Sequence, residues 1–292
     1  MKVQKKDEGK RRRKCKWCFF FRPHPAKAPN FKRANPTVLP ELRELAMDSA
    51  LSTVCKQYVK PDNAVTLLAH AQGCLLSLVA IACLDIFLRY ATLREYKTRS
   101  KARWFMLHSL VNFLIVGFSF HDAILVLTMP ICSMLIPLQS WVPSYLAYSL
   151  HLYHFIAYTV VRMEDIVHHL LFVGTFGVVN FLMSWGSIVN LLLLFMTGVP
   201  GGIDYAMLSL VKINKFSRLE EKRINSHINV WLRMPGLVVV SAIMYSCFIM
   251  GQTRVHGLAA LLCIALTFLN GVYYMQQVVR NYENEKNKNV SK

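Results

Sequence analysis

The sequence predicts an all-α protein that crosses a membrane about seven times, because its composition, its long apolar segments and its charge distribution all favour this fold class. Of 292 residues, 54% are hydrophobic and only 17% are charged, a balance typical of multi-pass membrane proteins. This composition excludes a disordered or collagen-like chain. The eight cysteines lie mostly singly in apolar stretches, so no disulfide framework is expected.

Seven apolar segments approach the roughly 20 residues that a helix needs to cross the hydrocarbon core. They are 64–89, 105–129, 142–161, 168–185, 188–212, 232–251 and 255–277. The boundary between the fourth and fifth rests on a turn signal at 184–187. We expect four parts: a tail at 1–60, a first transmembrane helix at 64–89, a transmembrane domain at 103–282 and a polar tail at 283–292.

Basic residues predict the orientation, since short cytoplasmic loops are enriched in Lys and Arg. The loops at 89–103 and 212–233 and the C-terminal tail are basic and fall on one side of a seven-span chain. Arg233 is counted with the second loop. That side is expected to be cytoplasmic.

The N-terminal tail conflicts with this scheme, because residues 1–60 carry 16 Lys and Arg against five acidic residues, yet an odd span count places them outside. Either the tail translocates despite its charge, or one span is re-entrant or miscounted. The run Lys10–Lys16 is a solvated arm or a contact for an anionic lipid surface, and no nucleic-acid partner is expected. Cys15 and Cys18 suit palmitoylation better than zinc, since no second pair follows. An interfacial helix is expected at 42–58, and a capping box starting a surface helix at Ser217.

Ionisable residues inside the spans are candidates for function, because each costs about 2.5 to 3.5 kcal/mol in the hydrocarbon. Asp85 is expected to pair with Arg89 one turn on, and His70 to be a hydrogen-bonded packing residue. His121 and Asp122 lie near the end of their span, where they are either functional or simply hydrated.

Two histidine clusters stand out. His151 and His154 share a helical face, and Asp165 lies one turn before His168 and His169. A carboxylate on one imidazole nitrogen makes the other nitrogen a better general base. The alternative is a polar network that only holds helices together.

The fifth span contains Pro200 between glycines, four residues before Asp204. Pro200 predicts a broken helix, which is tolerated at membrane depth only where protein or a wet cavity covers the backbone. We therefore expect Asp204 to face an interior polar chamber between the third, fourth and fifth spans.

Several of these residues resemble the TLC (TRAM, LAG and CLN8 homology) membrane family, which includes ceramide synthases, over roughly 103–282. The resemblance rests on segments that include Trp104 with His108-Ser109, the stretch 149–158, Asp165 with His168-His169, 204–212 and 270–274. It implies a TLC-like helix bundle around a lipid-sized cavity in an endoplasmic-reticulum membrane. His108, His151 and His154 would line that cavity.

The resemblance implies a protein that binds membrane lipid and influences lipid composition or homeostasis. The alternative is an acyl-CoA-dependent N-acyltransferase for sphingoid bases, with His168 and His169 as general base and Asp165 or Asp204 orienting it. Against that activity, Gly-Val-Pro-Gly-Gly precedes a lone Asp204 where ceramide synthases carry His-Asp and a second Asp. A metal-dependent lipid oxidase would need more histidine boxes, and a transporter an inverted repeat. No metal or cofactor is expected.

Overall fold

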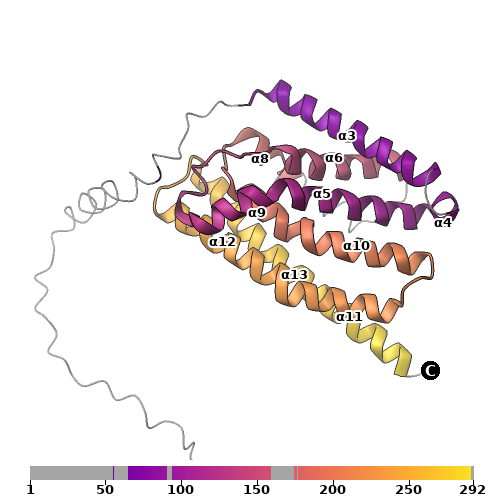
Figure 1. Ribbon diagram of the computed structural model, residues 1–292. Coiled ribbons are helices and arrows are strands. Elements are labelled where there is room, and N and C mark those ends of the chain that lie inside the picture. Colours follow the sequence, from indigo (N-terminus) through magenta and orange to yellow (C-terminus); the bar gives the residue numbers. More distant parts are fainter. Residues whose placement is uncertain (1–54, 56–64, 91–93, 159–173, 176, 291–292) are drawn as a thin grey trace, which may run out of the picture. The chain divides into compact units, whose positions relative to one another are not determined.

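The computed structural model describes residues 55, 65–90, 94–158, 174–175 and 177–290. In this part of the chain the backbone forms helices and turns, without strands (Figure 1). In chain order the elements are α3 (Leu67–Tyr90), α4 (Arg94–Thr98), α5 (Ser100–Thr128), η1 (Pro130–Cys132), α6 (Val142–Ala157), α8 (Val178–Leu182), α9 (Ile188–Leu193), η3 (Leu194–Gly198), α10 (Val199–Lys212), α11 (Arg218–Ile228), η4 (Asn229–Arg233), α12 (Met234–Ile249) and α13 (Gly257–Val290).

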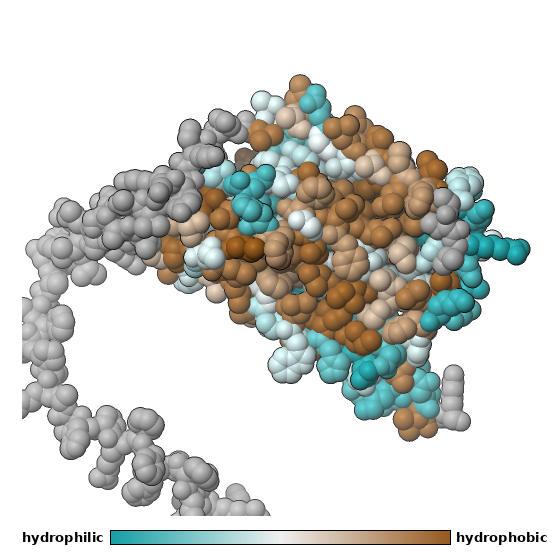
Figure 2. Space-filling view, viewed as in Figure 1, coloured by the Kyte–Doolittle hydropathy of each residue, from teal (hydrophilic) through white to brown (hydrophobic). Residues whose placement is uncertain are grey.

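Five segments in the described ranges are long and apolar enough to cross a membrane: Leu67–Tyr90, Ser100–Thr128, Ile188–Lys212, Arg218–Ile249 and Gly257–Val290. They expose large hydrophobic side chains, among them Leu76, Phe87 and Phe120. Figure 2 shows such residues over much of the visible face, with hydrophilic residues gathered near α4 and the end of α13. Because water-soluble proteins rarely expose apolar patches this extensive, the chain is an integral membrane protein.

The predicted spans agree with these helices to different degrees. The fifth matches at both ends, the first and second shift by a few residues, and the seventh extends as helix through most of the expected polar tail, to Val290. The third corresponds to α6, which has 16 residues. Residues 168–173 and 176 of the fourth, at 168–185, fall outside the described residues. With the exception of Cys55, so do the interfacial helix at 42–58 and the basic tail at 1–60.

Helix α5 packs against α3, α6, α9 and α10. Its buried positions include Leu107, Val111 and Ile115, spaced four residues apart along one face and fully buried. Next to Asn112 and Phe113, Gly201 and Gly202 bring α10 close: a Cβ on Gly201 would lie 2.6 Å from the Asn112 amide nitrogen, and one on Gly202 3.0 Å from Phe113. Small residues at this interface therefore allow close packing of two spans.

The predicted break at Pro200 is wrong. The chain stays helical from Ile188 to Lys212, and the proline occupies the first turn of α10, directly after the π-helical turn η3. A proline is tolerated at the first turn of a helix, where its missing N–H is not needed. A π turn widens the helix locally and is common at functional sites, so the proline is accommodated without unwinding the span.

The expected surface helix after Ser217 is also wrong in part. Helix α11 does begin next to Ser217, but the serine side chain makes no capping hydrogen bond. Through the π turn η4 this helix continues into α12, so the two form one candidate span. The sequence could not separate these cases, because a polar first half is compatible with either a surface helix or a span that extends beyond the membrane.

A disulfide and an ion pair correct two further expectations. A disulfide joins Cys55 to Cys132, where no cross-link was expected. Asp85 pairs with Arg103 and not with Arg89: the Arg103 Nε donates to Asp85 Oδ1 at 2.9 Å. Tertiary partners, which spacing in the sequence does not reveal, decide both contacts.

The three basic segments lie at one end of the helices, as predicted. Arg99 donates a hydrogen bond of 2.6 Å to the backbone carbonyl of Lys212, which joins the first two loops. Arg218 and Glu285 form an ion pair of 3.5 Å, which joins the second loop to the end of α13.

Candidate functional site

A pocket of about 250 Å³ lies among the helices. It is lined by residues of α5, α6 and every helical element from α8 to α13. Along α9 to α10 the lining extends from Ile188 to Asp204, about 24 Å at the rise of an α-helix. This length approaches the roughly 30 Å thickness of a hydrocarbon core.

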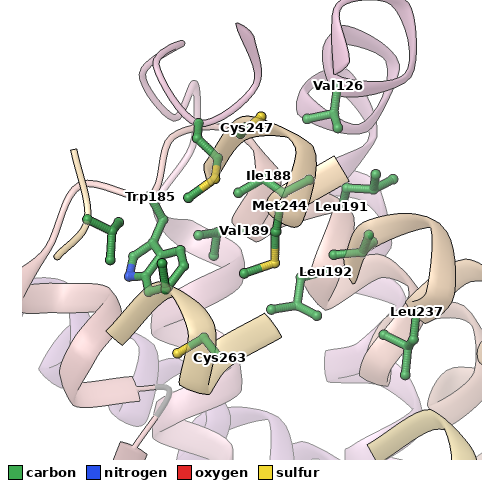
Figure 3. Packing of buried hydrophobic residues seen from close by; sticks show 14 of the residues in the cluster. Val126, Trp185, Ile188, Val189, Leu191, Leu192, Leu237, Met244, Cys247 and Cys263 are labelled. Atoms are coloured by element: carbon green, nitrogen blue, oxygen red, sulfur yellow. The ribbon is translucent and has the colours of Figure 1, made fainter. Parts of the chain in front are cut away.

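One part of the pocket is apolar. Its wall includes Trp185, Ile188, Val189, Met244 and Cys263. These residues belong to the largest hydrophobic cluster of the described chain, and Figure 3 shows how their side chains pack near one another. Such a wall offers apolar contacts and few hydrogen bonds, which suits a hydrocarbon chain.

The other part of the pocket is polar and is supplied by α10, α11, η4 and α13. Its lining residues are Asp204, Tyr205, Asn225, Asn229, Arg233, Asn270, Tyr274 and Val278. Asn225, Asn229 and Arg233 follow one another at four-residue intervals, so they share a face of the continuous α11–η4 helix. This four-residue spacing is visible in the sequence, but Arg233 was assigned to the basic loop because of its charge, so the shared face was missed.

Arg233 is the centre of the polar part. Its Nη2 donates to Asn270 Oδ1 at 2.9 Å and its Nη1 to Asn229 Oδ1 at 3.4 Å, while the guanidinium carbon lies 4.3 Å from the centroid of the Tyr274 ring. The guanidinium Nε and the Asn270 Nδ2 are buried and have no hydrogen-bond partner. Arg233 therefore does not belong to the cytoplasmic loop, as the sequence had suggested, but to the pocket wall.

Asp204 lies on the facing helix α10 and also lines the pocket. Its Oδ1 is buried without a hydrogen-bond partner. Its carboxyl hydrogen-bonds to that of Glu221, which is fully buried and pairs with Lys222 at 3.1 Å. Lys222 and Arg233 act on Asp204 electrostatically. Among the described residues, neither Asp204 nor Arg233 forms a direct ion pair, so the pocket wall holds one acidic and one basic group that interact only at a distance.

Two of the predicted histidines meet at the pocket. His108 and His151 both line it, with ring centroids 6.4 Å apart and planes nearly perpendicular. His108 also stacks on Tyr205 at 4.4 Å between centroids, and His151 Nδ1 lies 2.7 Å from the carbonyl oxygen of Ala147. The other ring nitrogen of His151, Nε2, is not engaged by this carbonyl.

His154 does not line the pocket. Its ring packs edge-on against Trp104, with centroids 4.6 Å apart. Of the two histidines on this helix, His151 therefore lines the pocket and His154 does not. Asp165, His168 and His169, the residues assigned to catalysis with Asp204, lie outside the described residues.

Asp122, which the sequence left open between function and simple hydration, is fully buried. It accepts hydrogen bonds from Ser187 at 3.0 Å, from the Asn190 side chain at 2.5 Å and from the backbone N–H of Gln139 at 3.1 Å. These contacts occupy the carboxylate, so it connects α5 to α9 and to the loop that precedes α6.

No group of three or more His, Cys, Asp or Glu side chains is arranged to hold a metal in the described part of the chain. What the arrangement offers is a long pocket with an apolar part, two imidazoles on its wall and a polar part with an acidic and a basic group. Comparisons with models of protein families, with curated proteins and with solved structures find no match to this chain.

Proposed function

We propose that this protein binds a membrane lipid in the pocket and thereby influences the lipid composition of the membrane in which it lies. One observation carries the proposal: a pocket among membrane-spanning helices combines an apolar wall with a polar part. An acyl chain would take the apolar part around Trp185 and Met244, and a head group the part around Arg233. An endoplasmic-reticulum membrane, which the TLC resemblance implies, belongs to the same proposal.

The polar residues themselves support ligand binding over a purely structural role. A polar network that only joins helices is expected to satisfy its own donors and acceptors, as the one that joins Asp85 to Arg103 does. At the pocket, by contrast, Asp204, Arg233 and Asn270 each keep a buried polar atom without a partner. Unmet hydrogen-bonding capacity next to a space is what a missing ligand would satisfy.

The test compares a variant with a filled pocket to a matched control. In Val189→Phe, a larger side chain enters the apolar wall, whereas Val239→Phe makes the same change on an exposed position of α12. Lipids that remain with each purified protein after extensive detergent exchange are extracted and measured by mass spectrometry. We expect about one lipid per chain for the native protein and the control, and little for Val189→Phe. Equal lipid content in all three would contradict the proposal.

A second candidate function is acyl transfer from acyl-CoA to a long-chain amine, favoured by the two imidazoles of His108 and His151 on the pocket wall. One imidazole would accept the proton of the amine as nitrogen attacks the thioester carbonyl, and return it to the departing thiolate of CoA, so that amide and free thiol form.

Purified protein incubated with acyl-CoA and long-chain amine would test this chemistry. We expect amide product from the native chain and its loss in His108→Ala/His151→Ala or His168→Ala/His169→Ala. Absence of amide with the native chain at every chain length, together with retained lipid, would leave lipid binding as the function.

A further inference from the structure

We propose that the polar part of the pocket selects a single-chain lipid with a zwitterionic head group, one that joins an anionic group to an ammonium group bearing N–H. This inference rests on the proposed lipid binding and specifies its ligand class. It follows from which polar atoms of the pocket lack hydrogen-bond partners, and from whether each of these atoms is a donor or an acceptor.

Two buried hydrogen-bond donors of the pocket have no acceptor. Arg233 uses both terminal nitrogens on Asn229 and Asn270, but its Nε is buried without an acceptor, and so is the Nδ2 donor of Asn270. Since Arg233 and Asn270 are joined by a hydrogen bond of 2.9 Å, these two unused donors belong to neighbouring side chains. An anionic group such as phosphate or carboxylate can accept from both, and hydrogen bonds between charged groups are among the strongest in proteins.

One buried acceptor in the polar part of the pocket lacks a donor: Asp204 Oδ1, on the helix that faces Arg233. Arg233 and Asp204 act on each other electrostatically, but no ion pair within 4.0 Å joins them among the described residues. A buried acceptor without a donor is costly, and an ammonium group that donates to Asp204 Oδ1 would offset this cost.

The carboxyl of Glu221 pairs with Lys222 at 3.1 Å and hydrogen-bonds to Asp204. Asp204 Oδ1 and the donors of Arg233 and Asn270 therefore remain for the ligand. A fatty acid would satisfy these donors and leave Asp204 Oδ1 without a donor, and a long-chain amine would do the reverse. A head group with both charges satisfies both, whereas a neutral alcohol offers neither charge.

The size of the pocket limits the rest of the ligand. Its volume of about 250 Å³ lies below the usual range of roughly 300 to 1,000 Å³ for small-molecule sites. The lining nevertheless extends about 24 Å along α9 to α10. A long and narrow space of this kind accommodates one hydrocarbon chain, not two side by side.

The experiment measures binding of four amphiphiles with the same hexadecyl or hexadecanoyl chain: a lysophosphatidylethanolamine, the fatty acid, the amine and the alcohol. Each displaces a fluorescent single-chain lipid from the purified full-length protein in detergent. We expect the native protein to bind the zwitterion about tenfold or more tightly than the other three, given the strength of hydrogen bonds between charged groups.

Two variants separate the charges. Arg233→Gln is expected to weaken binding of the zwitterion and the fatty acid about tenfold and to leave the amine unchanged, and Asp204→Asn to weaken binding of the zwitterion and the amine and to leave the fatty acid unchanged. The matched control is Arg223→Gln, which removes one positive charge from an exposed position on α11. It should leave all four affinities at native values.

The outcomes keep the two proposals apart. Equal affinity of the native protein for all four head groups would overturn the zwitterion inference while lipid binding stands, and this comparison requires no variant to fold. The inference also fails if both variants, with unfolding temperatures near native, keep the native order of affinities. Failure of every amphiphile to displace the probe would reject lipid binding itself, and with it the inference.

Discussion

Asp85 shows how this chain tolerates a buried charge. Its carboxylate accepts from Arg103 at 2.9 Å and from the hydroxyls of Tyr153 and Tyr158, each at 3.0 Å. The network joins α3, α5 and the end of α6, and both charged side chains are 11% exposed. Every partner here comes from the protein, whereas Asp204 and Arg233 at the pocket each keep one buried polar atom without a hydrogen-bond partner.

Removal of one partner from this network should be costly. Asp85→Ala leaves the guanidinium of Arg103 buried without its carboxylate, so we expect a loss of about 3 kcal/mol in the free energy of unfolding. The control is Glu220→Ala, which breaks an exposed pair with Arg223 and should cost under about 1 kcal/mol. Unfolding in detergent, followed by circular dichroism, checks both values. Equal losses would show that the buried network contributes no more than a surface pair.

The sequence predicted polar residues well where the partner is local or the chemistry simple. His70 was expected to be a hydrogen-bonded packing residue, and its Nδ1 lies 3.0 Å from the Tyr145 hydroxyl, which confirms it. The predicted partner of Asp85 was wrong, because Arg89 is close in sequence whereas Arg103 is close in space. The role of Arg233 was missed because a basic residue at the edge of an apolar segment usually belongs to a loop.

At the scale of elements, the turn expected at 184–187 is confirmed between α8 and α9. Gly186 adopts a φ of 69°, a left-handed conformation that glycine adopts without steric cost. A Cβ at this position would lie 2.5 Å from the carbonyl oxygen of Ser133 and 2.8 Å from that of Ile136. The turn is therefore fixed both by its own backbone and by the loop that it contacts.

A pair of glycine substitutions separates these two effects. Gly251 has nearly the same φ, 68°, but no atom lies within 4 Å of its added Cβ. Gly251→Ala should cost about 1 kcal/mol for the left-handed conformation alone. Gly186→Ala adds a backbone clash and should cost about 3 kcal/mol. Unfolding temperatures of the two variants provide the measurement, and a Gly186→Ala protein as stable as Gly251→Ala would contradict the close approach of this turn to Ser133 and Ile136.

The π turns η3 and η4 mark the limit of prediction at this scale. Hydropathy fixed the ends of the span at 188–212, but the insertion of a π turn depends on how its side chains pack. Thr197 in η3 donates to Asn112 of α5 at 2.9 Å, and Asn229 and Arg233 in η4 reach the pocket. Because such turns follow from tertiary contacts, helical periodicity alone could not locate them.

At the scale of the whole described chain, the disulfide and the basic loops lie at opposite ends of the helices. Cys132 follows the last residue of α5, whereas Arg99 precedes the first, and α5 is 29 residues long, about 43 Å. Cys55 lies with Cys132 at the end away from the basic loops. Since disulfides persist in oxidising compartments, this end is expected to be luminal or extracellular, in agreement with the positive-inside rule.

Cysteine labelling tests this orientation. Arg254→Cys places a thiol in the loop before α13, at the disulfide end, and Lys215→Cys places one in the loop between α10 and α11; both positions are exposed. In sealed microsomes with the cytoplasmic face outward, a membrane-impermeant maleimide should label Lys215→Cys at once and Arg254→Cys only after permeabilisation. The native chain is the control for the background of its free cysteines. Immediate labelling of Arg254→Cys would reverse the assignment.

The hydropathy and charge of the sequence therefore sufficed for the all-helical membrane fold and for the shared side of the basic loops. They could not supply the disulfide, the partner of Asp85 or the place of Arg233 in the pocket wall. Span positions depend on the local cost of exposing a helix to lipid, whereas these contacts depend on which faces of distant helices meet. The pocket was expected on chemical grounds, but its polar part around Arg233 came from tertiary structure.

The cross-link between Cys55 and Cys132 spans a sequence separation of 77 residues, and that interval contains all of α3 and α5. The two thiols meet only when both helices have been inserted side by side in opposite directions. Oxidation during synthesis therefore records a completed helical hairpin, and ribosome-bound chains arrested at increasing lengths should gain the bond only once Cys132 and the second helix have left the translocon.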